Sequence, residues 1–329
     1  MLGSGVIGLT TALALLEASD RVRVVADTPV EATTSHLAAG IWFPTQAGPP
    51  DRVADWSRRT YRIFAAEAAT GAVPGVLMRE SLMLYADGLP EITPDWAASV
   101  GAVRPATAAE LPPGYRAGLR FAVPLADMPV YLPWLRRRIQ DLGAELITAQ
   151  VESLDGLLRN SLRNSLRDIG GPTDAIVNCT GLAAREVAGD PSVFPVRGQI
   201  IRVTNPGLTM SVRDVNHPAG RAYVHPRGAD CILGGTLEAG RWDTTVDPAT
   251  ADSIRRRCLD LVPALAAATV IEHRVGLRPA RPTVRLEADH RYPSGPRIVH
   301  NYGHGGSGIT LSRGCAQEVV SLLHSPVPA

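Results

Sequence analysis

The chain has 329 residues, of which 45% are hydrophobic and 20% are charged, and its 33 basic residues almost balance its 32 acidic ones. This balance excludes binding to nucleic acid or to an anionic membrane surface that is driven by a strong net charge. The length favours two domains over one small core.

Hydropathy and cysteine spacing exclude further classes of protein. No apolar stretch approaches the roughly 20 residues that a membrane span requires, so we expect no membrane partner. The four cysteines are widely scattered, and none forms a pair with the spacing of a metal site. We therefore expect a reduced, cytoplasmic protein that has no metal site and no disulfide framework.

The first 27 residues predict a glycine loop, a helix and a strand. Gly3, Gly5 and Gly8 have the spacing that lets a backbone approach a pyrophosphate at a helix N-terminus. Residues 22–27 form a β-branched run that ends at Asp27, 19 residues after Gly8. An acidic residue at about this distance hydrogen-bonds the adenosine ribose in dinucleotide-binding proteins. The contacts expected from this region are those of Gly3, Gly5, Val6, Ile7, Gly8 and Asp27.

The strand that should precede this loop is short, because only Met1 and Leu2 stand before Gly3. Such a strand normally lies in the middle of a sheet, where its loss leaves ladder groups unpaired and opens a gap. We therefore expect the native start to lie upstream of Met1. The alternative is a tolerated stub that weakens cofactor binding.

The rest of the chain alternates between helical and strand-like segments. Helices are expected near residues 53–69, 130–142 and 250–261, and strands near 144–151, 174–181 and within 195–236. The tandem NSLR repeat at residues 160–167 is interpreted as a lengthened surface loop, which costs little entropy. The chain ends in a strand, a glycine loop and a helix.

Nucleotide-type elements thus stand at both ends and in the middle of the chain, around β-rich segments. This order predicts an α/β fold with a discontinuous Rossmann-like cofactor-binding domain and a second, β-rich substrate-binding domain. The expected boundaries are 1–42, 141–194 and 275–329 for the first domain, and 43–140 and 195–274 for the substrate-binding and interface domain.

The C-terminal loop GHGGSGIT, residues 303–310, distinguishes between two dinucleotides. It opens a helix near Gly308, and a helix N-terminus has free NH groups and a partial positive charge. Directed at the pyrimidine edge of a flavin, this charge stabilises the negative charge that reduction places on N1–C2=O. A nicotinamide gains no negative charge on reduction, so the second loop favours FAD over NAD.

Five blocks of sequence resemble the D-amino-acid oxidase family, which includes D-aspartate oxidase. They are GSGVIGLTTA, TTSHLAAGIWFP, AIVNCTG, VGLRPARPTVRLE and VHNYGHGGSGIT, and they span nearly the whole chain. The resemblance implies a two-domain α/β flavoprotein that holds FAD tightly. It implies oxidative deamination of a D-amino acid to an imino acid, and so to a 2-oxo acid and ammonia, with oxygen reduced to hydrogen peroxide. The expected partners are a D-amino acid and oxygen, and analogy with relatives adds a homodimer.

Three residues are expected to hold the substrate. Arg278, in GLRPARP, offers a guanidinium that pairs with a planar carboxylate through two parallel hydrogen bonds, and the family arginine at this place holds the α-carboxylate. Tyr223 matches the family tyrosine whose hydroxyl shares that carboxylate, and the Gly306 carbonyl would accept from the substrate amine. Hydride transfer from Cα to flavin N5 needs no base for a Cα proton, so His304 is expected to be structural.

The resemblance also assigns flavin contacts. The TTSHLAAG segment would supply hydroxyls near the phosphate and ribityl chain and a backbone that lies against the ring. Val151 and the CTG turn would flank the adenine, and the C-terminal loop would contact the O2 end of the flavin. The residues expected to bind FAD in these segments are Thr33, Thr34, Ser35, Ala39, Gly40, Val151, Thr180, Gly181, Arg278, Gly303, Gly305, Gly306, Gly308, Ile309 and Thr310.

Two positions leave alternatives open. Arg313 stands where relatives carry a tryptophan, and its side chain either extends to solvent or weakens the packing. Residues 211–224 stand where some relatives have an active-site lid, and the segment is short, which favours neutral D-amino acids as substrates. Against this, Arg213, His217 or Arg221 could pair with a side-chain carboxylate, as in D-aspartate oxidase.

Two further alternatives concern the reaction itself. The short first strand leaves open a non-catalytic flavin-binding protein, or a protein that does not load FAD. A nicotinamide-linked dehydrogenase is a more distant alternative, and peroxide formation without NAD would exclude it.

Overall fold

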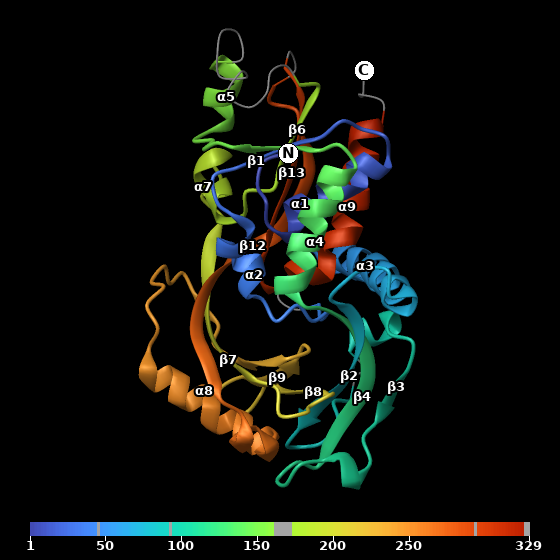
Figure 1. The fold of residues 1–329 in the computed structure, drawn as a ribbon, viewed down its shortest axis with the longest axis vertical. Helices are drawn as coiled ribbons and strands as arrows, with labels where there is room; N and C mark the ends of the chain where they lie inside the picture. The colour runs from blue at the N-terminus through green and yellow to red at the C-terminus, as the bar shows by residue number, and fades with distance from the viewer. Residues whose placement is uncertain (45–46, 92–93, 161–172, 293–294, 326–329) are drawn as a thin grey trace.

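The computed structural model describes residues 1–44, 47–91, 94–160, 173–292 and 295–325, so residues 161–167 of the NSLR repeat lie outside the described part. The fold is mixed α/β, with most helices in the upper part of Figure 1 and long strands in the lower part. The helices are α1 (Val6–Glu17), α2 (Thr34–Leu37), α3 (Pro50–Thr70), α4 (Met128–Asp141), α5 (Leu154–Asn160), α7 (Ala184–Val187), α8 (Pro248–Leu261) and α9 (Gly308–His324). Within the described ranges, no helix is both long and apolar enough to cross a membrane.

The strands form one small parallel pair and one large mixed sheet among the described residues. The large sheet follows the order β3-β4-β2-β8-β9-β10-β7-β12-β13-β6, and β11 pairs with β7. The strands are β1 (Arg23–Ala26), β2 (Val76–Tyr85), β3 (Val103–Pro105), β4 (Ala117–Ala126), β5 (Glu145–Thr148), β6 (Ala175–Asn178), β7 (Phe194–Thr204), β8 (Ser211–Asp214), β9 (Ala222–Pro226), β10 (Asp230–Gly234), β11 (Glu238–Ala239), β12 (Val270–Asp289) and β13 (Arg297–His304).

Leu2 occupies the place of the short first strand, between β1 and β6. Its NH donates to Val177 O at 2.8 Å, and its carbonyl accepts from Cys179 N at 2.9 Å. On the other side, Gly3 N donates to Val25 O at 2.9 Å. Because β1 pairs with β5 and β6 with β13, Leu2 joins two parallel pairs. The unpaired ladder groups expected from the sequence are therefore not found at Leu2 and Gly3.

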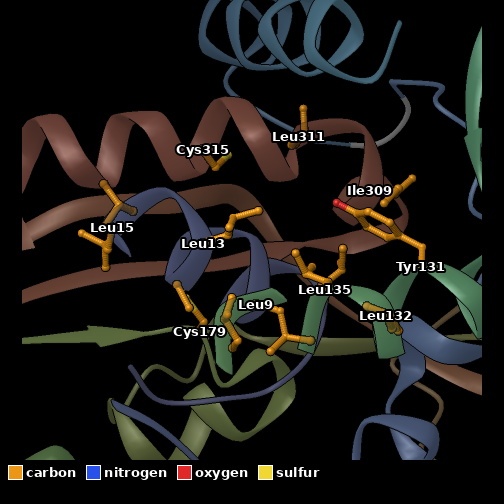
Figure 2. Close-up of a cluster of buried hydrophobic side chains, with 14 of the residues drawn as sticks. Leu9, Leu13, Leu15, Tyr131, Leu132, Leu135, Cys179, Ile309, Leu311 and Cys315 are labelled. Carbon is orange, nitrogen blue, oxygen red and sulfur yellow. The ribbon is translucent and has the colours of Figure 1, made fainter. Parts of the chain in front are cut away.

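Helices α1, α4 and α9 share one hydrophobic core. Figure 2 shows Leu9 and Leu13 of α1, Leu135 of α4 and Leu311 of α9 gathered in it, and all four are buried. Burying a side chain of this size contributes about 1.5–3 kcal/mol each. This packing brings the beginnings of α1 and α9 together, since a Cβ on Gly308 would lie 3.7 Å from a Val6 methyl group.

The long strands β7 and β12 connect the upper and lower parts of the molecule (Figure 1). They pair antiparallel from Val270 to Ala280 of β12, which places Arg278 opposite Val196 and Gly276 opposite Gly198. Helix α8 packs on one face of this part of the sheet, where Ile254 of the helix joins a buried cluster of sheet residues.

Arg313 takes neither of the two expected positions. It is buried in α9 and forms an ion pair with Glu67 of α3, and its guanidinium lies 5.9 Å from the ring centre of Phe64. Burial raises the pKa of Glu67, and the Arg313 charge offsets part of that rise. Arg313 and Glu67 thus form a largely buried ion pair between two helices.

Replacing Arg313 by alanine is expected to lower the free energy of unfolding by about 3 kcal/mol, because it leaves the largely covered Glu67 carboxylate without its ion-pair partner. Denaturant unfolding of the FAD-loaded protein measures the change. Arg256→Ala is the matched control, since this arginine lies exposed on α8, and it should change stability by less than about 0.5 kcal/mol. Equal stability of the two variants would show that the pair contributes nothing.

Candidate active site

One cavity of about 610 Å³ brings both glycine loops together with strands of the large sheet. Its size is typical of small-molecule and cofactor sites. Gly8 and Thr310 do not line it. The predicted residues that do are Gly3, Gly5, Val6, Ile7, Asp27, Thr33, Thr34, Ser35, Ala39, Gly40, Val151, Thr180, Gly181, Tyr223, Arg278, Gly303, Gly305, Gly306, Gly308 and Ile309.

In the N-terminal loop, glycines allow backbone segments to pack closely against one another. Gly3 has a φ of +100°, and a Cβ there would lie 2.5 Å from Cys179 O, so only glycine fits. Gly5 caps α1, which has no acidic residue in its first turn, so the positive helix end is uncompensated. Gly8 lies behind the loop, where a Cβ would meet Gly3 O at 2.0 Å. Its role is to let the helix pack against the loop.

Two turns at the carboxyl ends of parallel strands extend the cavity. Asp27 follows β1 with an exposed carboxylate, and its Oδ1 accepts from Thr28 Oγ1 at 2.8 Å. Thr180 follows β6, and Asn178 Oδ1 accepts from its NH at 3.1 Å and from its hydroxyl at 2.7 Å. The carboxyl edge of parallel strands is where α/β proteins bind nucleotides.

The C-terminal loop leads into α9 through two glycines with positive φ, Gly303 at +85° and Gly305 at +55°. Helix α9 then begins at Gly308 with no acidic residue in its first turn. Thr310 lies outside the cavity, because its Oγ1 accepts from Phe43 N at 2.9 Å and donates to Phe43 O at 3.2 Å. It therefore ties α9 to the segment before α3. This differs from the prediction, in which Thr310 contacts the flavin.

Arg278 lies flat on the backbone of Gly198. A Cβ on Gly198 would come within 2.0 Å of Arg278 Nη1, so the guanidinium occupies the space that a side chain would fill. Nη1 donates to Thr236 O at 3.2 Å, and the side chain forms no ion pair within the described ranges. A guanidinium that has no carboxylate partner and lines a cavity is suited to bind an anionic ligand.

Tyr223 rests in the same way on Gly234, where a Cβ would lie 2.0 Å from the phenol Cζ. Burial raises the pKa of Tyr223, and the nearby Arg278 charge offsets part of the rise. The phenol is therefore a neutral hydrogen-bonding group at pH 7. The ring stacks on His225 with centroids 4.8 Å apart and an interplanar angle of 14°.

Two buried histidines line the cavity as neutral groups. Burial lowers the pKa of His304 to about 3, and its Nε2 has no hydrogen-bond partner among the described residues. The pKa of His225 lies well below its usual value, because burial penalises the charged ring and Arg213 repels it. At neutral pH neither imidazole is protonated to the cation, so neither can act as a cationic proton donor.

Of the three side chains proposed to face an acidic substrate, Arg213 and Arg221 line the cavity, whereas His217 lies 3.9 Å from Asp260. Arg213 is 5% exposed, and its Nε and Nη2 have no hydrogen-bond partner in the described part of the chain. Its guanidinium lies 4.1 Å from the ring centre of Phe43. Burial lowers the pKa of Arg213 to about 10, so it stays charged at pH 7.

Sequence reasoning did not find Gly198, Gly234, Thr236, His225 or Phe43. Gly198 and Gly234 contact the functional side chains only through strand pairing, so no local motif marks them. His225 stands two residues after Tyr223 in β9, and alternation along a strand places both on one face. This two-residue period is the signal from which His225 could have been found.

FAD fits the residues that are present. The glycine loop lines the cavity at the start of α1, and this helix has no acidic residue in its first turn, which suits the pyrophosphate. The start of α9 suits a flavin edge that becomes negative on reduction. Within the described ranges, no group of three or more His, Cys, Asp or Glu residues could hold a metal ion.

Comparison with known proteins gives the same family over nearly the whole chain. The family model described as FAD dependent oxidoreductase matches residues 2–322. The chain is 48% identical to a D-amino-acid oxidase of Rubrobacter xylanophilus over 322 residues, covering 98% of this chain and 94% of the relative. It is 34% identical to human D-aspartate oxidase over 345 residues, covering 100% and 97%.

A solved structure of similar fold is glycine oxidase from Geobacillus kaustophilus, with a TM-score of 0.77, 21% identity and coverage of 98% of this chain and 93% of that one. This likeness supports the α/β fold. The predicted family, fold class and FAD cofactor are confirmed. The chain therefore belongs to the FAD dependent oxidoreductase family and is a flavin-dependent enzyme.

Proposed function

We propose that this enzyme is a D-amino-acid oxidase, which converts a D-amino acid and oxygen to a 2-oxo acid, ammonia and hydrogen peroxide. The observation that carries the proposal is Arg278, a guanidinium without a carboxylate partner on the wall of the cavity that both glycine loops share. Relatives that are 48% and 41% identical bear the name D-amino-acid oxidase, which supports the same substrate class.

Three groups of this chain orient the substrate in our proposal. Arg278 holds the α-carboxylate through two parallel hydrogen bonds, and the Tyr223 hydroxyl donates a third. The Gly306 carbonyl accepts from the substrate amine, which must be neutral for Cα to release hydride. Orientation of this kind supplies a large part of a rate enhancement. Because the Cα hydrogen leaves as hydride, no residue needs to remove it as a proton. Burial also lowers the pKa of His225 and of His304, so both are weak bases.

Bound FAD supplies the acceptor for hydride from Cα and passes the electrons to oxygen. The chain would hold its pyrophosphate at Gly3, Gly5, Val6 and Ile7, and its adenosine ribose at Asp27. The isoalloxazine ring would lie against Ala39 and Gly40, with its O2 edge at the start of α9.

The test is oxidation by the purified, FAD-containing protein of D-alanine, D-valine and D-methionine, followed by oxygen uptake and peroxide formation. We expect turnover of the D-isomers without NAD and none of L-alanine. Protein that carries FAD but is not reduced by any D-amino acid would support the non-catalytic alternative. Colourless protein that gains no activity with added FAD would point to a protein that does not load the cofactor.

A second candidate function, oxidation of acidic D-amino acids, is favoured by Arg213. The short segment 211–224 favours neutral substrates, yet a buried, charged arginine without a carboxylate partner costs several kcal/mol unless an anion meets it. Register places Arg213 opposite Tyr223 on neighbouring strands. A substrate held by Arg278 and Tyr223 would therefore direct its side chain toward Arg213.

Replacing Arg213 by glutamine decides between the two substrate classes. If acidic substrates are preferred, kcat/KM for D-aspartate should fall about a hundredfold, which corresponds to loss of a charged hydrogen-bonded contact of about 3 kcal/mol. The value for D-alanine should change much less, and the ratio of the two constants is the readout. An unchanged ratio, with D-alanine preferred throughout, would retain the neutral class and reject the acidic one.

Three further expectations, on location, oligomeric state and domain division, belong to the proposal. We place the enzyme in the cytoplasm and as a homodimer, the second by analogy with relatives. We also retain the division into an FAD-binding domain at 1–42, 141–194 and 275–329 and a substrate-binding domain at 43–140 and 195–274. Limited proteolysis and light scattering address the division and the oligomeric state.

A further inference from the structure

A second cavity of about 380 Å³ adjoins the first. It lies between α8, which contributes Thr250, Ser253 and Arg257, and two loops at residues 219–221 and 235–237. Arg221, Thr236 and Leu237 line both cavities, so one layer of residues separates them. We call this second cavity the vestibule.

The vestibule wall carries positive charge that no carboxylate neutralises. Arg221 is half-buried, and no hydrogen bond or ion pair of its side chain is found in the described part of the chain. Arg257 is 4% exposed, and its guanidinium donates only to neutral groups, among them Ser253 Oγ at 2.9 Å. Three acidic residues lie near the lining residues in the chain. Glu238 pairs with Arg197 and Arg241, and Asp247 accepts from Thr250 Oγ1 and Ala249 N at the start of α8. Asp252 lies exposed on α8.

Arg257 also fixes the two loops in place. Its Nε donates to Arg221 O at 2.6 Å, and its Nη2 donates to Gly235 O at 3.0 Å. Gly235 N in turn donates to Arg221 O at 3.2 Å. The next residue, Thr236, accepts the hydrogen bond from Arg278 through its carbonyl. The free guanidinium of Arg221 is therefore presented on a fixed backbone. Arg221 stands two residues before Tyr223 in the chain, and hydrogen bonds through Arg257 and the 235–236 backbone link it to Arg278.

We propose that the vestibule is a binding site for small carboxylates, in which Arg221 captures the carboxylate of an amino acid before Arg278 holds it. The inference rests on the proposed function for the identity of the carboxylate. Two unneutralised arginines beside a low-dielectric wall focus potential and raise the encounter rate of an anionic group. Arg221 borders both cavities, so the carboxylate moves from one guanidinium toward another without passing an unpaired negative charge.

The test compares Arg221→Gln and Arg221→Lys with Arg256→Gln, which removes the same charge from the exposed face of α8. Benzoate is the probe, since it is a planar carboxylate with no Cα hydrogen to lose. Its association and dissociation rates with the FAD-containing protein are followed by flavin absorbance at several ionic strengths. The kcat/KM for D-alanine is measured in parallel.

We expect Arg221→Gln to lower the association rate about fivefold and to flatten its dependence on ionic strength, as loss of electrostatic attraction requires. Arg221→Lys should recover most of the rate, and Arg256→Gln should behave as wild type. An association rate unchanged in Arg221→Gln would overturn the proposal. So would a change confined to dissociation, because it would place Arg221 on the bound carboxylate. Binding of benzoate without oxidation of any D-amino acid would reject the proposed function alone.

Discussion

Arg278→Ala is expected to lower kcat/KM for the preferred D-amino acid about a thousandfold, which corresponds to about 4 kcal/mol. The reason is the loss of two charge-assisted hydrogen bonds to the α-carboxylate, each worth about 1.5–3 kcal/mol. Most of the loss should appear in KM, because the same contact holds substrate and transition state. Steady-state oxygen uptake over a range of substrate concentrations measures both constants.

Arg278→Lys is the matched control, since it keeps the charge but not the planar pair of donors, and it should recover only part of the loss. The side chain makes no ion pair in the described part of the chain. Removing it should therefore leave the unfolding temperature and the flavin absorbance close to those of the wild type. Near-normal kinetics in the alanine variant would remove Arg278 from the substrate site.

Gly198→Ala is expected to disable the same contact without touching Arg278. The added Cβ would lie 2.0 Å from Nη1 and 2.4 Å from Cζ, distances that no structure tolerates, so the guanidinium must move. It is the far end of a flexible side chain, so the displacement should cost little stability. A misplacement of about 1 Å can cost about a hundredfold in rate, and we expect a fall of that order in kcat/KM.

Gly228→Ala serves as the control for this substitution. Gly228 stands in the turn between β9 and β10 of the same sheet, and a Cβ there meets nothing within 4 Å. It should leave kcat/KM and stability near wild type. If Gly198→Ala also kept wild-type kinetics, Arg278 would not need to lie on the β7 backbone to bind substrate.

Local motifs account for the part of the site that could be predicted from the sequence. Each glycine loop can be recognised from the spacing of its glycines within one short segment, and Asp27 from its distance to the first loop. Arg278 and Tyr223 could be assigned because each lies in a block that resembles the family. The glycine spacing also predicts a cofactor contact for Gly8, whereas the structure gives Gly8 a packing role against Gly3 O.

Contacts between distant strands could not be predicted. Arg278 meets Gly198 only because β12 pairs with β7 in one register. A shift by one residue would turn Arg278 to the other face. The ion pair of Arg313 with Glu67 joins residues on two helices that pack through their side chains. Leu2 likewise completes a sheet whose neighbours lie far along the chain.

The most direct test of the account is anaerobic mixing of the FAD-containing protein with a single D-amino acid, followed by flavin absorbance. Our account predicts that the yellow colour bleaches with the D-isomer in the wild type, and that Arg278→Ala needs far higher substrate concentrations for the same rate. Protein that keeps its colour with every D-amino acid tested, or that bleaches equally well without the Arg278 guanidinium, would contradict it.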